Sequence, residues 1–425
     1  MTTETKPDTT GEAKKEKFFT TPLLIIFATV FIDLIGFGMV IPILPYYANT
    51  APFFATPLDI GFLFASYSLM QFFFSPLLGR LSDRYGRRPI LFISLVGSAV
   101  GYLVLGLANT LFLVFLGRII GGISGGNIST AQAYIADVTS KENRAKGMGL
   151  FGAAFGLGFI LGPAIAGILS KYGVHVPFYV AAAMSMANAI ALYFILPESI
   201  KVGAAAKVVE RKNRLLELFD SLRDKQFREI NIVYFLLITA FSIMTYAFVL
   251  YTTFRFEYTA EQNGYLFAFV GLISIVAQGV LFGRLVKQFG EAVLIVIGCL
   301  ILVASLFALP FIGPAYGGLA ALLVGLAVMS FGNSMASPGL TSIASKSAAD
   351  DDQGRTMGIM QSGAAMARTV GPVIGGVLLN NSLNAVDDFT VYRTFWAASI
   401  IMFVAFLVAL YFARSKRTNV IEHIN

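Results

Sequence analysis

The chain has 425 residues, of which 56% are hydrophobic and only 13% are charged, with a formal net charge of +7. A soluble domain carries about 25% charged residues, so this composition excludes an ordinary soluble protein and indicates one whose solvent is lipid. Apolar stretches of about 20 residues, each long enough to cross a hydrocarbon core as a helix, recur along the chain. The alternating pattern of an outer-membrane β-barrel does not occur, so we expect an all-α integral membrane protein.

Twelve apolar stretches are predicted to be transmembrane helices. They cover residues 22–47, 58–81, 89–108, 111–136, 147–170, 177–196, 229–254, 261–286, 291–311, 314–343, 356–380 and 391–412. The first stretch is too long for a cleaved signal peptide, so we interpret it as an uncleaved span.

These stretches form two groups of six, which we predict to be helical bundles at 22–196 and 229–412. Polar tails at 1–21 and 413–425 flank them, and a polar linker at 197–228 joins them. Within the linker, one apolar face predicts an amphipathic helix that lies on the membrane surface.

The lysine and arginine residues predict the orientation. One alternating set of connections and tails holds 26 of them, whereas the other set holds three, Lys171, Arg255 and Arg393. Because positive charge stays on the cytoplasmic side, both termini are expected in the cytoplasm, with the chain in the inner (cell) membrane. The basic charge is thereby explained by topology, and no nucleic-acid partner is expected.

The two groups of six spans repeat one another. Gly61-Phe-Leu-Phe-Ala65 returns as Gly264-Tyr-Leu-Phe-Ala268, and Gly162-Pro163 with Gly167 returns as Gly371-Pro372 with Gly376. The order of the spans is preserved, so the two repeats have the same orientation and are related by an axis along the membrane normal. A site between the two repeats is therefore expected.

Asp33 is the only carboxylate well inside a predicted span, roughly 16 Å deep along the helix. A carboxylate there costs about 2.5–3.5 kcal/mol to insert and persists beside a partner or a water-filled cavity. Arg118, in the fourth span, is the expected partner, and Asn127 is interpreted as a helix-packing residue on the opposite side of that span. We predict that Asp33 and Arg118 couple transport to protons or to a substrate cation. A fixed ion pair that only joins helices is the alternative.

Polar side chains at helical spacing predict a cavity. Polar stripes in apolar helices face protein or water. Arg368 shares a helix face with Gln361 and is either a handle for an anionic or polar substrate or a side chain that snorkels. The residues expected to line the cavity are Tyr67, Gln71, Ser129, Gln132, Thr239, Ser242, Tyr246, Gln361 and Arg368.

A charged turn lies between the second and third spans, in Gly79-Arg80-Leu81-Ser82-Asp83-Arg84-Tyr85-Gly86-Arg87-Arg88-Pro89. Asp83 can cap a helix, and the arginines can form ion pairs across the cytoplasmic face. Such contacts would exist only while that face is closed. The turn is therefore expected to be a cytoplasmic latch made by Gly79, Asp83, Arg84, Gly86, Arg87 and Arg88.

Closely spaced glycines and a proline mark the fifth span, in Gly158-Phe-Ile-Leu-Gly162-Pro163-Ala-Ile-Ala-Gly167. Glycines four residues apart let helices approach closely, and a proline at depth produces a kink. The stretch is expected either to pack helices or to form a bend that decides which side opens.

Together these motifs resemble the major facilitator superfamily. Residues 79–89 look like its loop signature, Arg118-Ile-Ile-Gly-Gly like its fourth-span arginine motif, and residues 158–167 like its fifth-span antiporter motif. Asp33-Leu-Ile-Gly-Phe-Gly, with Pro42 and Pro45, resembles the first span of the twelve-span drug:proton antiporters. The tetracycline-efflux branch is closest, through Tyr67-Ser-Leu-Met-Gln71 and Ile135-Ala-Asp137. The resemblance implies proton-coupled export by alternating access, with Asp33 as proton carrier and Arg118 as its modulator.

The sequence thus predicts a monomeric exporter of hydrophobic and amphipathic small molecules, driven by protons. Proton-coupled uptake or translocation of a sugar, metabolite or lipid is the alternative transport function. A transporter-like sensor without flux is the alternative of another class. No nucleophile triad, phosphate loop or zinc-ligand spacing occurs, so we expect no enzyme activity, no cofactor and no metal site.

Overall fold

The computed structural model describes residues 20–50, 52–140, 143–200, 225–347 and 353–422. Nearly all of the chain within these ranges is helical. Twelve helical segments in them are long and apolar enough to cross a membrane, which confirms the all-α fold expected from hydropathy.

The first six spans are formed by seven α-helices and one short 3₁₀ turn, because the fourth span is interrupted. In chain order they are α1 (Thr21–Asn49), α2 (Pro57–Tyr85), α3 (Arg87–Gly106), α4 (Leu111–Ser124), η1 (Gly125–Asn127), α5 (Ile128–Val138), α6 (Arg144–Ser170) and α7 (Val176–Ile195). Local sequence sets the boundaries. Thr56 and Asp59 form a capping box at the start of α2, and Gly86, at φ +103°, separates α2 from α3.

The last six spans contain a stretch of π-helix in the eighth. They are α9 (Lys225–Phe256), α10 (Ala260–Val276), η3 (Ala277–Phe282), α11 (Gly283–Phe289), α12 (Glu291–Ala308), η4 (Leu309–Phe311), α13 (Gly318–Ser347), α14 (Gln353–Leu379) and α15 (Asp388–Glu422). The last helix continues to Glu422, ten residues beyond the end expected at 412. The amphipathic helix expected in the linker lies almost wholly outside the described residues.

Each group of spans packs mainly with its own members. In the first half, α1 packs on α6 and α7, and α3 packs on α4 and α7. In the second half, α9 packs on α14 and α15, and α12 packs on α13 and α15. The halves meet chiefly through α2 against α14 and α6 against α10.

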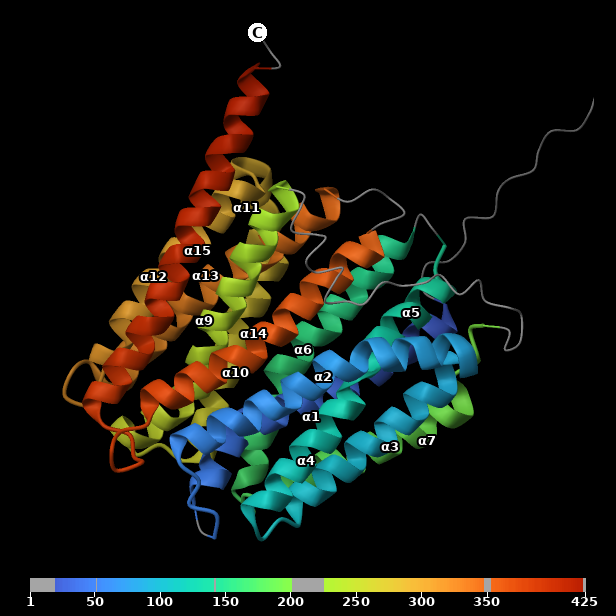
Figure 1. Cartoon of the computed structure of the whole chain (residues 1–425), viewed down its shortest axis with the longest axis horizontal. Coiled ribbons are helices and arrows are strands. Elements are labelled where there is room, and N and C mark those ends of the chain that lie inside the picture. Colours follow the sequence, from blue (N-terminus) through green and yellow to red (C-terminus); the bar gives the residue numbers. More distant parts are fainter. Residues whose placement is uncertain (1–19, 51, 141–142, 201–224, 348–352, 423–425) are drawn as a thin grey trace, which may run out of the picture.

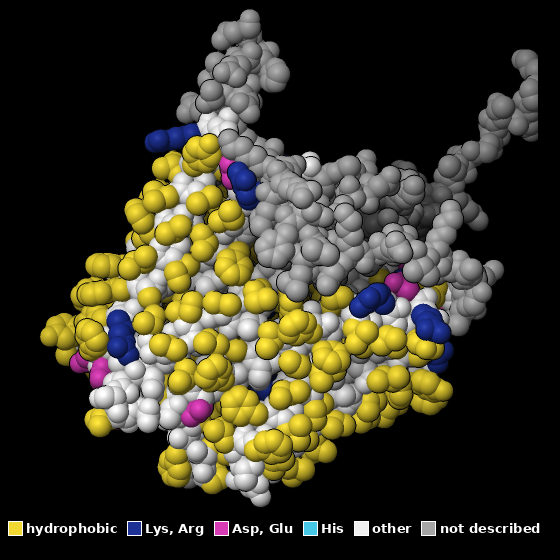
Figure 2. Space-filling view, in the orientation of Figure 1, with side chains coloured by type: hydrophobic (Ala, Val, Ile, Leu, Met, Phe, Trp, Pro, Cys, Tyr) yellow, Lys and Arg dark blue, Asp and Glu magenta, His cyan; other side chains and the backbone are white. Residues whose placement is uncertain are grey.

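The two ends of the molecule differ. We call the end at which α1 begins and α15 ends the termini face, and the opposite end the far face. The two halves diverge towards the termini face and converge towards the far face (Figure 1). Hydrophobic side chains cover the middle of the visible surface, whereas charged side chains gather near its two ends (Figure 2). This is the pattern of a protein with a lipid-facing belt.

Two glycine crossings join the halves at the far face. A Cβ atom added to Gly61 of α2 would lie 2.5 Å from the carbonyl oxygen of Pro372 and 3.3 Å from the Cα of Gly376 in α14. A Cβ atom added to Gly264 of α10 would lie 2.5 Å from the Cα of Gly167 in α6. The two crossings occupy equivalent positions in the sequence repeat, and we call them together the far seal.

Polar contacts accompany each crossing. The Tyr246 hydroxyl of α9 donates a hydrogen bond to the carbonyl oxygen of Pro57 in α2. The ammonium of Lys171, just after α6, lies 3.0 Å from the carboxylate of Glu261 in α10. The pocket described next is therefore closed on the far side by contacts between the halves.

Candidate functional site: a pocket between the two halves

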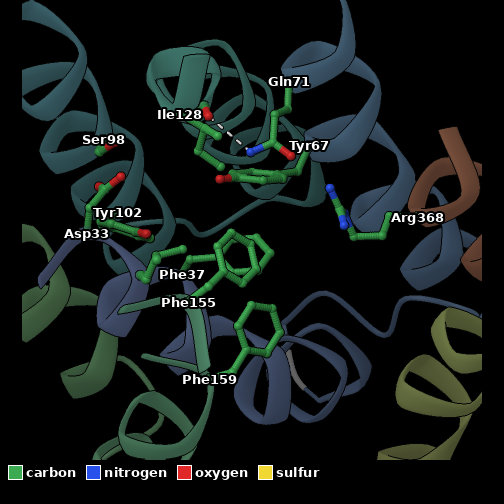
Figure 3. A pocket seen from close by; sticks show the side chains of 12 residues that line it. Asp33, Phe37, Tyr67, Gln71, Ser98, Tyr102, Ile128, Phe155, Phe159 and Arg368 are labelled. Atoms are coloured by element: carbon green, nitrogen blue, oxygen red, sulfur yellow. Dashed lines mark hydrogen bonds between the residues drawn. The ribbon is translucent and has the colours of Figure 1, made fainter. Parts of the chain in front are cut away.

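A pocket lies in the middle of the bundle and takes its walls from both halves (Figure 3). It encloses about 410 Å³ of space outside protein atoms, part of it open to solvent. Helices α1, α2, α3 and α6 and the η1 region supply most of the lining, and α14 supplies one residue; the lining is Asp33, Leu34, Phe37, Tyr67, Gln71, Ser98, Tyr102, Gly125, Ile128, Phe155, Phe159 and Arg368.

Asp33 lies on the pocket wall contributed by α1, with Asn127 rather than Arg118 as its hydrogen-bond partner. The Nδ2 of Asn127 donates to a carboxylate oxygen of Asp33 at 3.2 Å. The expectation that Asn127 faces away from the site is therefore wrong. Arg118 contacts α2 instead, so the side of the fourth span that carries Asn127, and not the side that carries Arg118, faces Asp33.

Arg118 is buried behind Tyr67 and does not line the pocket. Its Nε donates to the carbonyl oxygen of Leu63 at 3.1 Å, and its guanidinium carbon lies 4.4 Å from the centre of the Tyr67 ring and 5.7 Å from that of Phe64. Among the described residues no ion pair joins it to Asp33, so the expected direct pair is corrected. Arg118 instead holds one face of α2, which carries Tyr67 into the pocket.

Arg368 reaches the same pocket from α14 in the second half, opposite Asp33 (Figure 3). An adjoining pocket is lined by Gln71, Gln361 and Arg368, among others. The face that Gln361 and Arg368 share thus lines this adjoining pocket. The structure also places Tyr67 and Gln71 on the wall, and the Gln71 amide donates to the carbonyl oxygen of Gly125 at 3.0 Å.

Other residues expected in the cavity pack against neighbouring helices instead. The Thr239 hydroxyl donates to Phe235 within α9, and Ser242 lies where a Cβ atom on Gly371 would approach to 2.8 Å. These two residues fill the contact of α9 with α14. Tyr246 belongs to the far-face contacts described above.

Two residues of α5, the second part of the fourth span, were also expected in the cavity but do not line it. The Ser129 hydroxyl bonds to the carbonyl oxygen of Ser75 in α2, beside Gly79. Gln132 is half-buried on α5 and lines neither pocket. For Ser129 the polar face therefore marks contact with a neighbouring helix and not with the cavity.

The charged turn between α2 and α3 ties together helices of the first half. The guanidinium of Arg87 lies 2.5 Å from Asp83 and 3.0 Å from Asp137 at the end of α5. The backbone N–H groups of Arg87 and Arg88 donate to the carboxylate of Glu198, after α7, at 2.9 and 3.1 Å.

These contacts correct the expected latch. They are formed in a structure whose halves diverge on this face, so they do not require that face to be closed. Arg84 lies over the ring of its neighbour Tyr85. Gly86 is required because a Cβ atom there would lie 2.5 Å from the Glu198 carboxylate and its φ is positive.

The glycine motif of α6 packs against two helices at once. Cβ atoms added to Gly158 and Gly162 would lie within 2.6 and 2.7 Å of α1 atoms, at Leu34 and Gly38 respectively. Further along α6, the Pro163 carbonyl and Gly167 contact Gly264 of the other half. The motif therefore joins α6 both to its own bundle and to the far seal.

Several site residues were missed in the sequence. Tyr102, Ser98 and the aromatic cluster of Phe37, Phe155 and Phe159 line the pocket, but they carry no pattern that separates them from core residues. The second crossing of the far seal, by contrast, had a signal. Gly371-Pro372 with Gly376 repeats the fifth-span motif, and the repeat could have assigned it the same role.

The sequence matches a known protein family. The family model of the Major Facilitator Superfamily matches residues 26–348 and 316–422. The chain is 30% identical over 400 residues to the class H tetracycline resistance protein of Pasteurella multocida, covering 93% of this chain and 97% of that protein. It is 32% identical over 360 residues to the class C tetracycline resistance protein of Escherichia coli, covering 83% and 88%.

A further relative and a solved structure are also similar to this chain. Multidrug resistance protein 2 of Bacillus subtilis (strain 168) is 27% identical over 402 residues, covering 93% of this chain and 96% of that protein. Among solved structures, the human organic anion transporter MFSD10 (TETRAN) superposes with a TM-score of 0.69 at 24% identity, covering 92% of this chain and 99% of that one. The second comparison shows the fold alone.

Proposed function

The chain belongs to the Major Facilitator Superfamily, and we propose that it exports hydrophobic and amphipathic small molecules in exchange for protons. Family and spans make it a multi-pass membrane transporter and not an enzyme. One observation carries the proposal: a carboxylate, Asp33, lies deep in the first span on the wall of a pocket that both halves line. An intramembrane carboxylate in such a place is a candidate for ion coupling.

The orientation follows from the positive charges. With 26 lysines and arginines on the side of the termini and three on the other, the termini face is cytoplasmic in the proposal, and the membrane is the inner membrane. The structure then represents a state that diverges towards the cytoplasm and is closed outside by the far seal. Export requires the opposite state, in which the far seal opens. We propose that a single chain carries out this cycle as a monomer.

Asp33 is suited to carry the proton because its partner is neutral. The amide of Asn127 stabilises the carboxylate by one hydrogen bond without fixing its charge, as an arginine would. Protonation removes a charge from a narrow pocket and so lowers the cost of enclosing it. A proton entering along a potential of 100 mV supplies about 2.3 kcal/mol per charge moved.

Arg118 acts on this step through Tyr67 in the proposal. The guanidinium of Arg118 lies over the ring of Tyr67, and this ring lines the pocket together with Asp33. Arg118 therefore modulates the pocket without lining it. The aromatic cluster of Phe37, Phe155 and Phe159 suits the apolar part of a substrate. The printed names of the relatives, which are tetracycline and multidrug resistance proteins, support drug-like substrates.

The test is export from pump-deficient bacterial cells that express the wild type or Asp33→Asn. A panel of hydrophobic fluorescent dyes with cationic, neutral and anionic head groups is loaded, and efflux is followed after energisation. We expect efflux of at least one class, which falls to the level of uncoupler-treated cells in Asp33→Asn because the amide cannot carry the proton.

Asp388→Asn, which removes a carboxylate at the exposed start of α15, is the matched control and should export normally. Efflux that is unchanged in Asp33→Asn would remove Asp33 as the carrier. Accumulation of the dyes above the uncoupled level would replace export by uptake.

A further inference from the structure

We propose that Arg368 forms an anion-binding subsite, so that this transporter takes hydrophobic organic anions, such as an aromatic body bearing a carboxylate or sulfonate. The inference deepens the proposed function by naming the substrate class of the same pocket. It rests on that function for transport, but the binding step can be tested alone.

The first step of the argument is the position of Arg368. It lies fifteen residues from the start of α14 and eleven from its end, Gln353–Leu379. At 1.5 Å per residue these separations are about 22 and 16 Å, longer than an arginine side chain. Arg368 therefore does not snorkel to either interface, and its guanidinium stays in the pocket, where an intramembrane charge needs a function or a partner.

The second step is that Arg368 lacks the partners that the other two charges have. Asp33 accepts from Asn127, and Arg118 donates to Leu63 and lies on two aromatic rings. Arg368 makes no ion pair and no hydrogen bond with any part of the chain that the structure describes. Tyr234 and Tyr67 lie close enough to interact with its charge, but neither is a carboxylate. A guanidinium offers five N–H donors in a planar fork that matches a carboxylate or sulfonate.

The third step is the apolar surface beside it. Phe155 and Phe159 stack with their ring centres 5.3 Å apart, and Phe37 lies 5.5 Å from Phe159. In Figure 3 these rings form one side of the pocket, with Arg368 at its edge and Asp33 beyond them. A ligand with an aromatic body against the rings and an anionic group on Arg368 keeps its negative charge away from Asp33.

The arrangement also connects the halves. Arg368 comes from α14, whereas the aromatic rings come from α1 and α6. An anion bound in this way is held by both halves, so its binding reports on their approach. A ligand that contacted only the rings would not have this property.

The experiment is direct binding of a matched ligand pair to the purified full-length protein in detergent, by equilibrium dialysis. The pair is radiolabelled 2-naphthylacetate and its neutral isostere 2-naphthylacetamide. We expect wild type to bind the carboxylate roughly tenfold or more tightly than the amide, as one charge-assisted bidentate contact predicts. In Arg368→Gln this preference should fall to about one, while the affinity for the amide stays unchanged.

Two further variants control for charge and folding. Arg368→Lys keeps the charge without the fork and should retain part of the preference. Arg284→Gln removes an exposed arginine of α11 and should retain all of it. If Arg368→Gln does not fold, the preference of the wild type and the intermediate value in Arg368→Lys still test the subsite.

Equal wild-type affinities for the two ligands, no saturable binding of the carboxylate, or a preference unchanged in Arg368→Gln would each overturn the proposal. These results are independent of the export assay. Proton-driven efflux without a carboxylate preference would leave the function intact and remove the subsite. A carboxylate preference without efflux would support the subsite and remove the proposed export.

Discussion

The charged turn between α2 and α3 and the far seal hold helices together by opposite means. In the turn, the side chain of Arg87 pairs with the carboxylates of Asp83 and Asp137. Two backbone N–H groups of the turn donate to the carboxylate of Glu198, and all these groups belong to the first half. The far seal joins the two halves, and in each crossing a glycine of one half lies against the backbone of the other, Gly61 against Pro372 and Gly264 against Gly167. In the ion pair beside it, the side chains of Lys171 and Glu261 are 47% and 30% exposed.

The difference shows which contacts can be broken repeatedly. Separating partly buried charges leaves each without its partner and costs more than separating exposed ones, so such pairs are suited to helices that move as one body. Separating two glycine backbones inside helices leaves no polar group unsatisfied, because the helix already satisfies them. An exposed ion pair is replaced by water at little cost. The charged contacts of the turn therefore lie within one half, whereas the halves meet at the far face through the glycine crossings, an exposed ion pair and one hydrogen bond, from the Tyr246 hydroxyl to the Pro57 carbonyl oxygen.

The largest effect is expected from Gly264→Val, which breaks the far seal. Its Cβ atom alone would lie 2.5 Å from the Cα of Gly167, so the halves cannot close on the far face. We expect export to be lost and the pocket to open to the far side. The measurement is labelling of Gln361→Cys in the pocket by an impermeant thiol reagent added to either side.

Two features make this measurement clean. Cys299 is the only native cysteine and is fully buried, so it should not react. Gly152→Val is the matched control, because an added Cβ atom there meets nothing within 4 Å. Equal labelling from the far side in Gly264→Val and in wild type would show that the crossing is not what closes the pocket.

A smaller effect is expected from Arg87→Ala, which breaks the charged turn. Loss of a partly buried arginine that serves two carboxylates should lower the free energy of unfolding by about 2 kcal/mol or more. The side from which Gln361→Cys is labelled should not change, because these contacts lie within one half. Thermal unfolding in detergent measures the stability, with the exposed Arg84→Ala as control. An altered side of labelling with unaltered stability would restore the interpretation of the turn as a latch between halves.

The smallest effect is expected from the pair of Lys171 and Glu261. Lys171→Glu should slow export less than about fivefold, and the exchanged pair Lys171→Glu with Glu261→Lys should recover the wild-type rate. Hydrogen bonds from Lys171 to Glu261 and Tyr265 raise the lysine pKa above its usual 10.5. A raised lysine pKa gives a contribution that is complete below 10.5 and is lost only as the pH rises through the raised value.

The pH dependence of export gives a separate readout of the same pair. Since Lys171 stays charged from about pH 6 to pH 9, Lys171→Gln should leave the shape of the pH profile in that range unchanged. A shifted profile would mean that the pair takes part in proton coupling, and the exchanged pair should then shift it too.

Hydropathy and repetition predicted the fold because each acts over a whole span. Twenty apolar residues have few structures available in lipid, and a repeat of six spans constrains the arrangement of the rest. The depth of Asp33 was visible for the same reason. The partner of Asp33 was not visible, because the sequence of the fourth span does not tell which of its sides faces α1 and which faces α2.

Polar stripes were harder to interpret than buried charges. Tyr67 and Gln361 face the cavity, whereas Thr239 and Ser242 face α14, although all four belong to polar stripes on one face of a helix. The difference between the two pairs lies in what each side chain faces on the neighbouring helices. Thr239 and Ser242 lie against Gly371 on another helix, and a pattern within one helix contains no information about its neighbour.

The two crossings of the far seal have the form of an isologous contact. Gly61 meets Pro372 and Gly376, while Gly264 meets Pro163 and Gly167, so each half offers the same patch and receives the same patch. This is the geometry of a two-fold homodimer, here joined into one chain. Because both halves belong to one chain, the two crossings need not be identical. Lys171 and Glu261 flank one crossing, whereas the repeat places Asn380 and Leu58 at the other.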